Sequence, residues 1–310
     1  MELKVQNVSK FYNSSHKIVE AGKDINFVAR EGEVIGLVGA NGAGKTTLIK
    51  MICNLIYPTS GEILIDGKNI RSNKKLVEQN IGVVLEGARN VYNFLSVEQN
   101  IEYFSYLNGL SKKEMKKLKE ELLSLFSMEG KRSTTVSDLS RGMQQKVAIM
   151  IALIKNPAIL ILDEPTLGLD IVGQLKMKDI IKKLAQIDNR LVLVSSHDID
   201  LIRAVCTRAL CFDTGRIVND INLKLYGLTD TESNEIVVYI IDDMKIREKI
   251  ISNDLGIIDD SDETENIIKI ITTKSILEIM KHIDSSKVIK LEKRNSSFEE
   301  YLSEVEGIKR

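Results

Sequence analysis

The sequence predicts an α/β protein whose core is a parallel β-sheet, followed by a small α+β domain. Short, continuous apolar runs at 33–39, 158–162 and 191–195 are typical of strands buried on both faces of a sheet. Segments with apolar residues at helical intervals separate these runs, and strands alternating with helices indicate parallel pairing. The chain has 310 residues, 43% of them apolar, which is enough for two modest domains with packed cores.

Each element of the larger domain has its own local signal. Residues 1 to about 30 alternate between polar and apolar positions, which predicts a small antiparallel β-region. A helix is expected from Lys45, and Ser96 with Gln99 has the spacing of a capping box that opens another helix. The spacing of apolar residues predicts further helices at 111–128, 140–155, 172–186 and 198–206.

A polar stretch at 225–234 has the composition of a linker and divides the sequence into two predicted domains, 1–224 and 235–310. The second domain is predicted to contain strand 235–241, helix 244–252, strands 256–260 and 266–272, helix 275–283, strand 287–293 and helix 297–306. The order βαββαβ is the ferredoxin-like pattern, to which the last helix is added.

Charge and composition narrow the classes of function. The 43 basic and 44 acidic side chains leave a net charge of −1, so bulk charge attracts neither nucleic acid nor anionic lipid, and no nucleic-acid partner is expected. The 3 cysteines form no CxxC pair, so we expect reduced thiols in a cytoplasmic protein. No signal-peptide pattern is found, and the apolar stretch at 147–154 is too short to span a bilayer.

A glycine-rich segment between a predicted strand and a predicted helix carries the first chemical signal. The sequence GANGAGKT at 39–46 satisfies the pattern GxxxxGK[ST], which binds nucleotide phosphates through backbone N–H groups at a helix N-terminus. Lys45 is expected to contact the phosphates as a point charge, and the Thr46 hydroxyl to bind Mg²⁺. The candidate residues of this nucleotide site are Gly39, Asn41, Gly42, Ala43, Gly44, Lys45, Thr46 and Thr47.

Two adjacent carboxylates end the predicted strand that begins near residue 158. Because the carboxyl ends of parallel strands lie at one edge of a sheet, Asp163 and Glu164 are expected beside the phosphate loop. Asp163 is then a partner of Mg²⁺, and Glu164 is the general base that orients and polarises the attacking water. Adjacent acids after a strand are otherwise often only a solvated strand end, and the phosphate loop favours the catalytic interpretation.

Further motifs complete a resemblance to a known family. The segment LSRGMQQ at 139–145 precedes a predicted helix and contains Ser140 and Gly142, Asp170 follows the two acids, and His197 follows the strand LVLVSS. With the phosphate loop, these ordered motifs resemble the ATP-binding subunits of ABC transporters over residues 1 to about 220. The resemblance implies an ATPase with a P-loop NTPase fold, made of a parallel core sheet, an antiparallel β-subdomain and a helical subdomain.

In the family that the sequence resembles, each ATP is held between two subunits. The resemblance implies that Ser140 and Gly142 act on the nucleotide of the opposite subunit, that Asp170 reaches across the interface and that His197 contacts the γ-phosphate. Tyr12 is similar to the aromatic residue that stacks on adenine, and the alternative is a strand aromatic in the core. A homodimer, or a heterodimer with a second ATP-binding subunit, is therefore implied.

Two positions depart from the pattern of the family. Glu86 stands where many relatives carry a glutamine. Its carboxylate is a candidate ligand of Mg²⁺ or of the attacking water, and it also places a negative charge near the γ-phosphate, which opposes that role. The alternative is that Glu86 begins a loop that touches the permease. Arg141 replaces the first glycine of the more usual LSGGQ, which is similar to exporter-type members with a C-terminal extension.

The function implied by the resemblance is ATP hydrolysis that drives a separate integral-membrane permease, docked on the helical region after Glu86. Export of a drug, an antibiotic, a lipid or a polysaccharide is expected, with the chain on the inner face of the cell membrane. The alternative is a soluble ABC-type ATPase that acts on DNA or the ribosome. The segment between Lys45 and Ser140 is too short for the long coiled coils of DNA-repair members, and translation-type members usually carry two ATPase domains.

Overall fold

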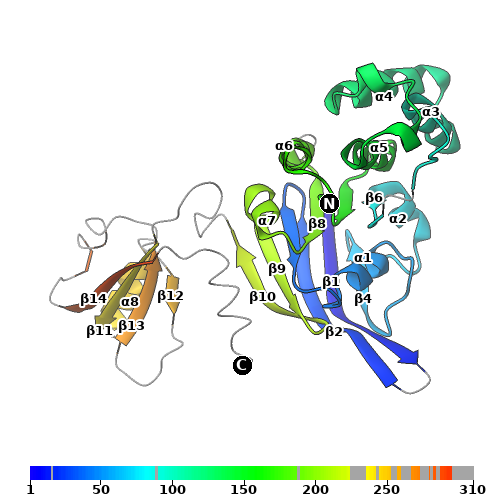
Figure 1. The fold of residues 1–310 in the computed structure, drawn as a ribbon. Coiled ribbons are helices and arrows are strands. Elements are labelled where there is room, and N and C mark those ends of the chain that lie inside the picture. The colour runs from blue at the N-terminus through cyan, green and yellow to red at the C-terminus, as the bar shows by residue number, and fades with distance from the viewer. Residues whose placement is uncertain are drawn as a thin grey trace. The chain divides into compact units, whose positions relative to one another are not determined.

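The computed structural model describes residues 1–14, 17–87, 90–186, 189–223, 235–241, 244–252, 257–259, 267–272, 279, 282–283 and 287–294. Contacts divide the chain into two compact units, Met1–Ile221 and Asn222–Arg310, and Figure 1 labels most of their helices and strands. Among the described residues, no helix combines the length and the apolar character that crossing a bilayer requires.

An antiparallel sheet at the N-terminus confirms the predicted β-region. Its strands are β1 (Glu2–Ser14), β2 (Lys17–Arg30), β4 (Ser60–Ile65) and β5 (Lys68–Asn69), in the order β2-β1-β4-β5. Leu3 and Val5 are buried at alternate positions of β1, and the alternation restarts at Val8 after an irregularity in the register. The irregularity keeps the apolar side chains on the core face.

A six-stranded sheet forms the centre of the first unit. In order across the sheet, its strands are β10 (Arg216–Asn222), β9 (Arg208–Asp213), β3 (Val34–Val38), β8 (Leu191–Ser196), β7 (Ile159–Asp163) and β6 (Ile81–Val84). The strands from β9 to β6 pair in parallel, and every residue of β3, β7 and β8 is buried. Strands covered on both faces need such continuous apolar runs, so the predicted core is confirmed.

Helices follow the strands where they were predicted, and α2 (Lys74–Asn80) is a further helix that was not predicted. They are α1 (Lys45–Ile52), α2 (Lys74–Asn80), α3 (Val97–Leu107), α4 (Lys112–Leu125), α5 (Arg141–Leu153), α6 (Ile171–Gln186) and α7 (Ile199–Val205). The predicted capping box of α3 is present, because the Ser96 hydroxyl accepts from the Gln99 N–H at 3.2 Å and the Gln99 side chain accepts from the Ser96 N–H at 2.9 Å. Figure 1 shows α3, α4 and α5 together, at the opposite end of this unit from the β1–β2 hairpin.

The second unit contains a four-stranded antiparallel sheet. Its elements are β11 (Glu235–Ile241), α8 (Met244–Ser252), β12 (Ile257–Asp259), β13 (Ile267–Thr272) and β14 (Val288–Arg294). The strand order β12-β13-β11-β14 is the one that a ferredoxin-like chain produces. The predicted linker at 225–234 and helix at 297–306 lie outside the described residues, as does most of the predicted helix at 275–283.

Candidate active site

The glycine-rich loop joins β3 to α1, and its shape requires glycine. Gly39 has φ 147° and Gly44 has φ 106°, a region that residues with a side chain rarely adopt. A Cβ at Gly39 would clash with the Phe212 carbonyl oxygen, and one at Gly44 would clash with that of Ala21. Gly44 is the N-cap of α1, and no side chain caps this helix, so its first-turn N–H groups stay available to an anion.

Lys45 lies inside the loop that precedes it. Its amine donates to the carbonyl oxygens of Gly39 at 2.5 Å and Ala40 at 3.1 Å, and the residue is only 6% exposed. Burial lowers the pKa of this amine, while the carboxylates of Glu164 and Asp163 oppose the shift. The loop therefore holds a positive charge where polyphosphate would bind.

Asp163 ends β7 in a buried cluster of oxygen atoms. It is 1% exposed, its Oδ1 accepts from the Ser195 hydroxyl at 2.5 Å, and the Thr46 hydroxyl lies 3.3 Å from Oδ2. Because β7 and β8 are parallel, Asp163 pairs with Ser195 in the register. The predicted Asp163 and Thr46 thus meet at the carboxyl edge of the sheet.

Glu164 is fixed by its backbone and by a neighbouring histidine. Its φ is 49°, and its N–H donates to the carbonyl and hydroxyl oxygens of Ser195, both at 3.1 Å. The carboxylate Oε2 lies 3.0 Å from Nδ1 of His197, and the Glu164 side chain is 10% exposed against 53% for His197. A carboxylate held in this way can accept a proton from a water at the loop.

A cavity of about 290 Å³, here called the phosphate-loop cavity, brings most of the predicted residues together. Glu86, which comes after β6, lines the cavity together with Glu164. The described lining does not include Tyr12 or His197. It consists of Ala21, Asn41, Gly42, Ala43, Gly44, Lys45, Thr46, Thr47, Glu86 and Glu164.

Ser140, Gly142 and Asp170 line a different hollow, of about 430 Å³, here called the Ser140 hollow. Ser140 is the N-cap of α5, where its hydroxyl accepts from the Met143 N–H at 3.4 Å. Asp170 Oδ1 accepts from the Gly173 N–H at 2.8 Å. The linings of the Ser140 hollow and the phosphate-loop cavity have no residue in common.

Tyr12 lies on the β1–β2 hairpin, and its side chain is 41% exposed. The Lys10 amine lies 5.2 Å from the centroid of its ring. Ala21, a residue of the phosphate-loop cavity, opposes the neighbouring part of β1, because Gly22 pairs with Lys10 and Glu20 with Phe11. The hairpin therefore links the tyrosine to the edge of the cavity, and the exposed ring differs from the core aromatic that the alternative assumed.

Comparison with known proteins decides the family. A family model described as "ABC transporter" matches residues 22–167. The ABC transporter ATP-binding protein NatA of Bacillus subtilis (strain 168) is 35% identical over 232 residues, which are 75% of this chain and 93% of that protein. The chain belongs to the ABC transporter ATPase family. It binds and hydrolyses ATP as a subunit of a transporter.

Two further matches describe this ABC subunit's relatives. The methionine import ATP-binding protein MetN 1 of Bacillus thuringiensis subsp. konkukian (strain 97-27) is 34% identical over 218 residues. These residues are 69% of this chain and 64% of that protein. Among solved structures, a dimeric ATP-binding cassette in a post-hydrolysis state, bound to ADP and Pi, matches with a TM-score of 0.65 and 31% identity. That match covers 71% of this chain and 98% of the other.

The oxygen cluster of this ABC ATPase suits a magnesium ion. Among the described residues, no group of three or more His, Cys, Asp and Glu side chains could hold a metal. Mg²⁺, however, usually takes only one or two protein oxygen ligands, together with substrate phosphates and water. The Thr46 hydroxyl and the Asp163 carboxylate provide that pair beside the loop.

Ser195 is the site residue that sequence reasoning missed. It contacts both acids, since its hydroxyl donates to Asp163 and accepts from the Glu164 N–H. The available signal was the serine pair that ends the strand LVLVSS. Only the register of β7 against β8 says which serine meets the acids.

Proposed function

We propose that this subunit hydrolyses ATP at two sites shared between a pair of subunits, which are two copies of this chain or one copy and a related subunit. Each nucleotide lies between the phosphate-loop cavity of one subunit and the Ser140 hollow of the other. The main support for the proposal is that the predicted residues line two separate cavities. No residue lines both the phosphate-loop cavity and the Ser140 hollow. A single chain therefore provides two half-sites.

An exposed apolar patch beside the Ser140 hollow supports a partner on this face. It consists of Leu167, Ile171, Val172 and Leu175, with exposed fractions from 50% to 77%. Val172 also lines the hollow. Large apolar side chains gathered on a surface favour burial against another protein.

Within each shared site, residues of the phosphate-loop side would carry out the chemistry. Lys45 and the first-turn N–H groups of α1 bind the phosphates, and Tyr12 stacks on adenine. Glu164 orients the attacking water and accepts its proton. His197, whose Nδ1 lies 3.0 Å from the Glu164 carboxylate, contacts the γ-phosphate. Thr46 and Asp163 hold Mg²⁺, with Glu86 as a further candidate ligand; the bound ion would neutralise phosphate charge.

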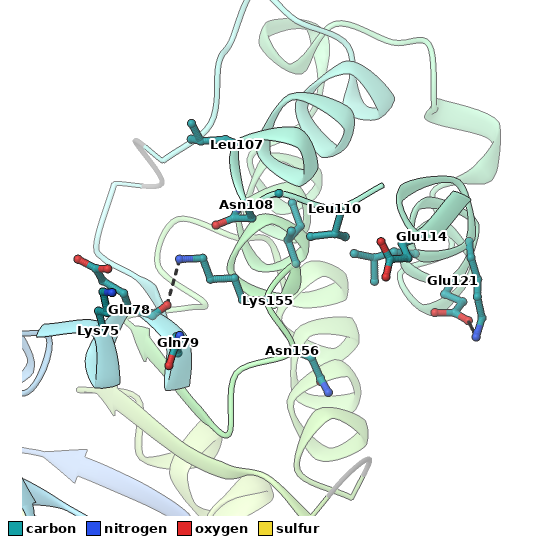
Figure 2. A pocket seen from close by; sticks show the side chains of 14 residues that line it. Lys75, Glu78, Gln79, Leu107, Asn108, Leu110, Glu114, Glu121, Lys155 and Asn156 are labelled. Atoms are coloured by element: carbon teal, nitrogen blue, oxygen red, sulfur yellow. Dashed lines mark hydrogen bonds and ion pairs between the residues drawn. The ribbon is translucent and has the colours of Figure 1, made fainter. Parts of the chain in front are cut away.

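A groove lined by α2, α4 and the C-terminal ends of α3 and α5 is the proposed docking site of the membrane permease. Its volume is about 940 Å³, and Figure 2 shows the side chains around it, with the Lys155 amine donating to the Glu78 carbonyl oxygen at 3.0 Å. The groove is lined by apolar side chains and by acidic and basic ones, and such a mixed lining fits an amphipathic segment of a partner protein. The apolar set is Leu107, Leu110, Leu118 and Ile154; the charged set is Lys75, Glu78, Glu114, Lys117, Glu121 and Lys155.

Export is the proposed direction of transport, with the chain on the inner face of the membrane. Arg141 and the C-terminal unit support it, because both are similar to features of exporter-type members. The cargo class is a drug, an antibiotic, a lipid or a polysaccharide. Uptake, as in the relatives named for methionine import, is the outcome that would contradict this proposal. Accumulation or loss of labelled cargo in membrane vesicles distinguishes export from uptake.

The permease proposal is tested by Leu110→Glu, which puts a carboxylate into the groove. Leu55→Glu is the matched control, because Leu55 is exposed and lies outside the lining. We expect the wild type and the control to sediment with the membranes of the source cell, and the Leu110 variant to be released while its ATPase activity in isolation is unchanged. A Leu110 variant that stays on the membranes would overturn the docking site.

A further inference from the structure

Arg141 places a guanidinium in the Ser140 hollow. It is the first residue of α5, directly after the N-cap Ser140, and it is exposed and lines the hollow. Its side chain lies against Gly168, since a Cβ at Gly168 would be 3.0 Å from Nη1 and 3.7 Å from Cδ of Arg141. The glycine therefore leaves room for the arginine between α5 and the loop that leads to Asp170.

No described residue of the same chain neutralises the charge of Arg141. In the part of the chain that the structure describes, its guanidinium has no hydrogen-bond or ion-pair partner. Asp170 is the acid of the hollow, and its Oδ1 is engaged by the Gly173 N–H. Lys146 and Lys176 also line the hollow, which therefore contains three cationic residues and one carboxylate. The Lys146 amine donates to the Phe126 carbonyl oxygen at 3.0 Å.

We propose that Arg141 contacts the triphosphate of the nucleotide held by the opposite subunit, as a positive charge supplied across the interface. The inference rests on the proposed shared site, because the hollow is separate from the phosphate-loop cavity of the same chain. A guanidinium suits the role, since its planar fork of N–H donors matches phosphate oxygens. Arg141 then adds a charged contact that the glycine of the usual LSGGQ motif cannot provide.

The contact makes a specific prediction for ATP-dependent dimerisation. In a Glu164→Gln background, which slows hydrolysis, the further change Arg141→Gln should raise the ATP concentration at half-maximal dimerisation by about 10- to 100-fold, the effect of losing one charge-assisted hydrogen bond. Arg141→Lys should recover part of the loss, because it keeps the charge without the fork. Light scattering during an ATP titration measures the midpoint.

Two controls separate this role from general damage. Arg71→Gln removes an exposed arginine outside both linings and should leave the midpoint unchanged. ATP binding to the monomer, measured at protein concentrations too low for dimers, should be unaffected by Arg141→Gln. A midpoint within about threefold of the parent, or an equal loss of monomer binding, would overturn the inference.

Mixed dimers test whether the arginine acts across the interface. In the same background, one subunit with Arg141→Gln and a partner with Lys45→Ala combine both lesions in one site and leave the other intact, so retention of one ATP per dimer is expected. Placing both changes in the same subunit, opposite an unchanged partner, should damage both sites. The reverse pattern would show that Arg141 acts on its own phosphate loop.

Ser140→Ala in the same mixed dimers shows whether a negative result concerns Arg141 alone or the proposed shared site. If Ser140→Ala shows the crossed pattern and Arg141→Gln does not, the inference on Arg141 fails and the shared site stands. If Ser140→Ala also acts within its own chain, the shared site fails and the inference fails with it.

Discussion

Replacement of Glu164 by glutamine is the most informative change in the phosphate-loop cavity. The side chain is 10% exposed, its Oε2 lies 3.0 Å from His197 Nδ1, and its backbone N–H is held twice by Ser195. An amide of the same shape can keep these positions, because its carbonyl oxygen still accepts from the histidine. The amide cannot accept the proton of the attacking water, so only the chemical step should suffer.

The expected loss is that of a positioned general base, about 10²–10⁴-fold in turnover. This corresponds to about 3–5 kcal/mol of activation free energy. ATP affinity should be unchanged, because Lys45 and the loop N–H groups are intact, and an ATP-bound dimer should accumulate. Phosphate release under saturating ATP and ATP binding at equilibrium measure the two quantities.

The matched control is Glu129→Gln, since Glu129 is an exposed carboxylate outside both linings. Lys45→Ala gives the complementary result, because it removes the buried amine and should abolish ATP binding itself. Hydrolysis by the Glu164 variant within about threefold of the parent would remove Glu164 from the role of base, since it falls far short of the effect of a positioned base.

Three further changes test other parts of the structure. Glu86→Gln should raise the Mg²⁺ concentration for half-maximal hydrolysis, because a neutral amide is a weaker ligand than a carboxylate; unchanged metal dependence and turnover would make Glu86 a permease contact instead. Asn100→Ala should lower the free energy of unfolding by about 1–3 kcal/mol in urea, because the buried amide bonds the backbone of Tyr92 and Ser96; a loss below about 0.5 kcal/mol would refute this. Gly44→Ala should prevent ATP binding measured by calorimetry, since a Cβ there meets the Ala21 carbonyl oxygen, and retained affinity would contradict the loop geometry.

Local sequence patterns predicted much of the fold because the physics that decides them is local. The capping box of Ser96 and Gln99 needs residues three positions apart, and it is present. The buried strands β3, β7 and β8 follow from uninterrupted apolar runs that suit a sheet covered on both faces.

Features that depend on contacts between distant segments could not be predicted in the same way. Ser195 reaches Asp163 only through the parallel register of β7 and β8. The placement of Arg141 against Gly168 depends on how α5 packs beside the loop after Glu164. No periodicity or motif spacing encodes these contacts, because each joins residues far apart in the chain.

The shared site is the central claim, and counting retained ATP tests it most directly. In the Glu164→Gln background, Ser140→Ala subunits are mixed with Lys45→Ala subunits, and mixed dimers are isolated by two different tags. Both lesions then fall on one composite site, so the mixed dimer should retain one ATP while each variant alone retains none. Mixed dimers that form but retain no ATP would contradict the account.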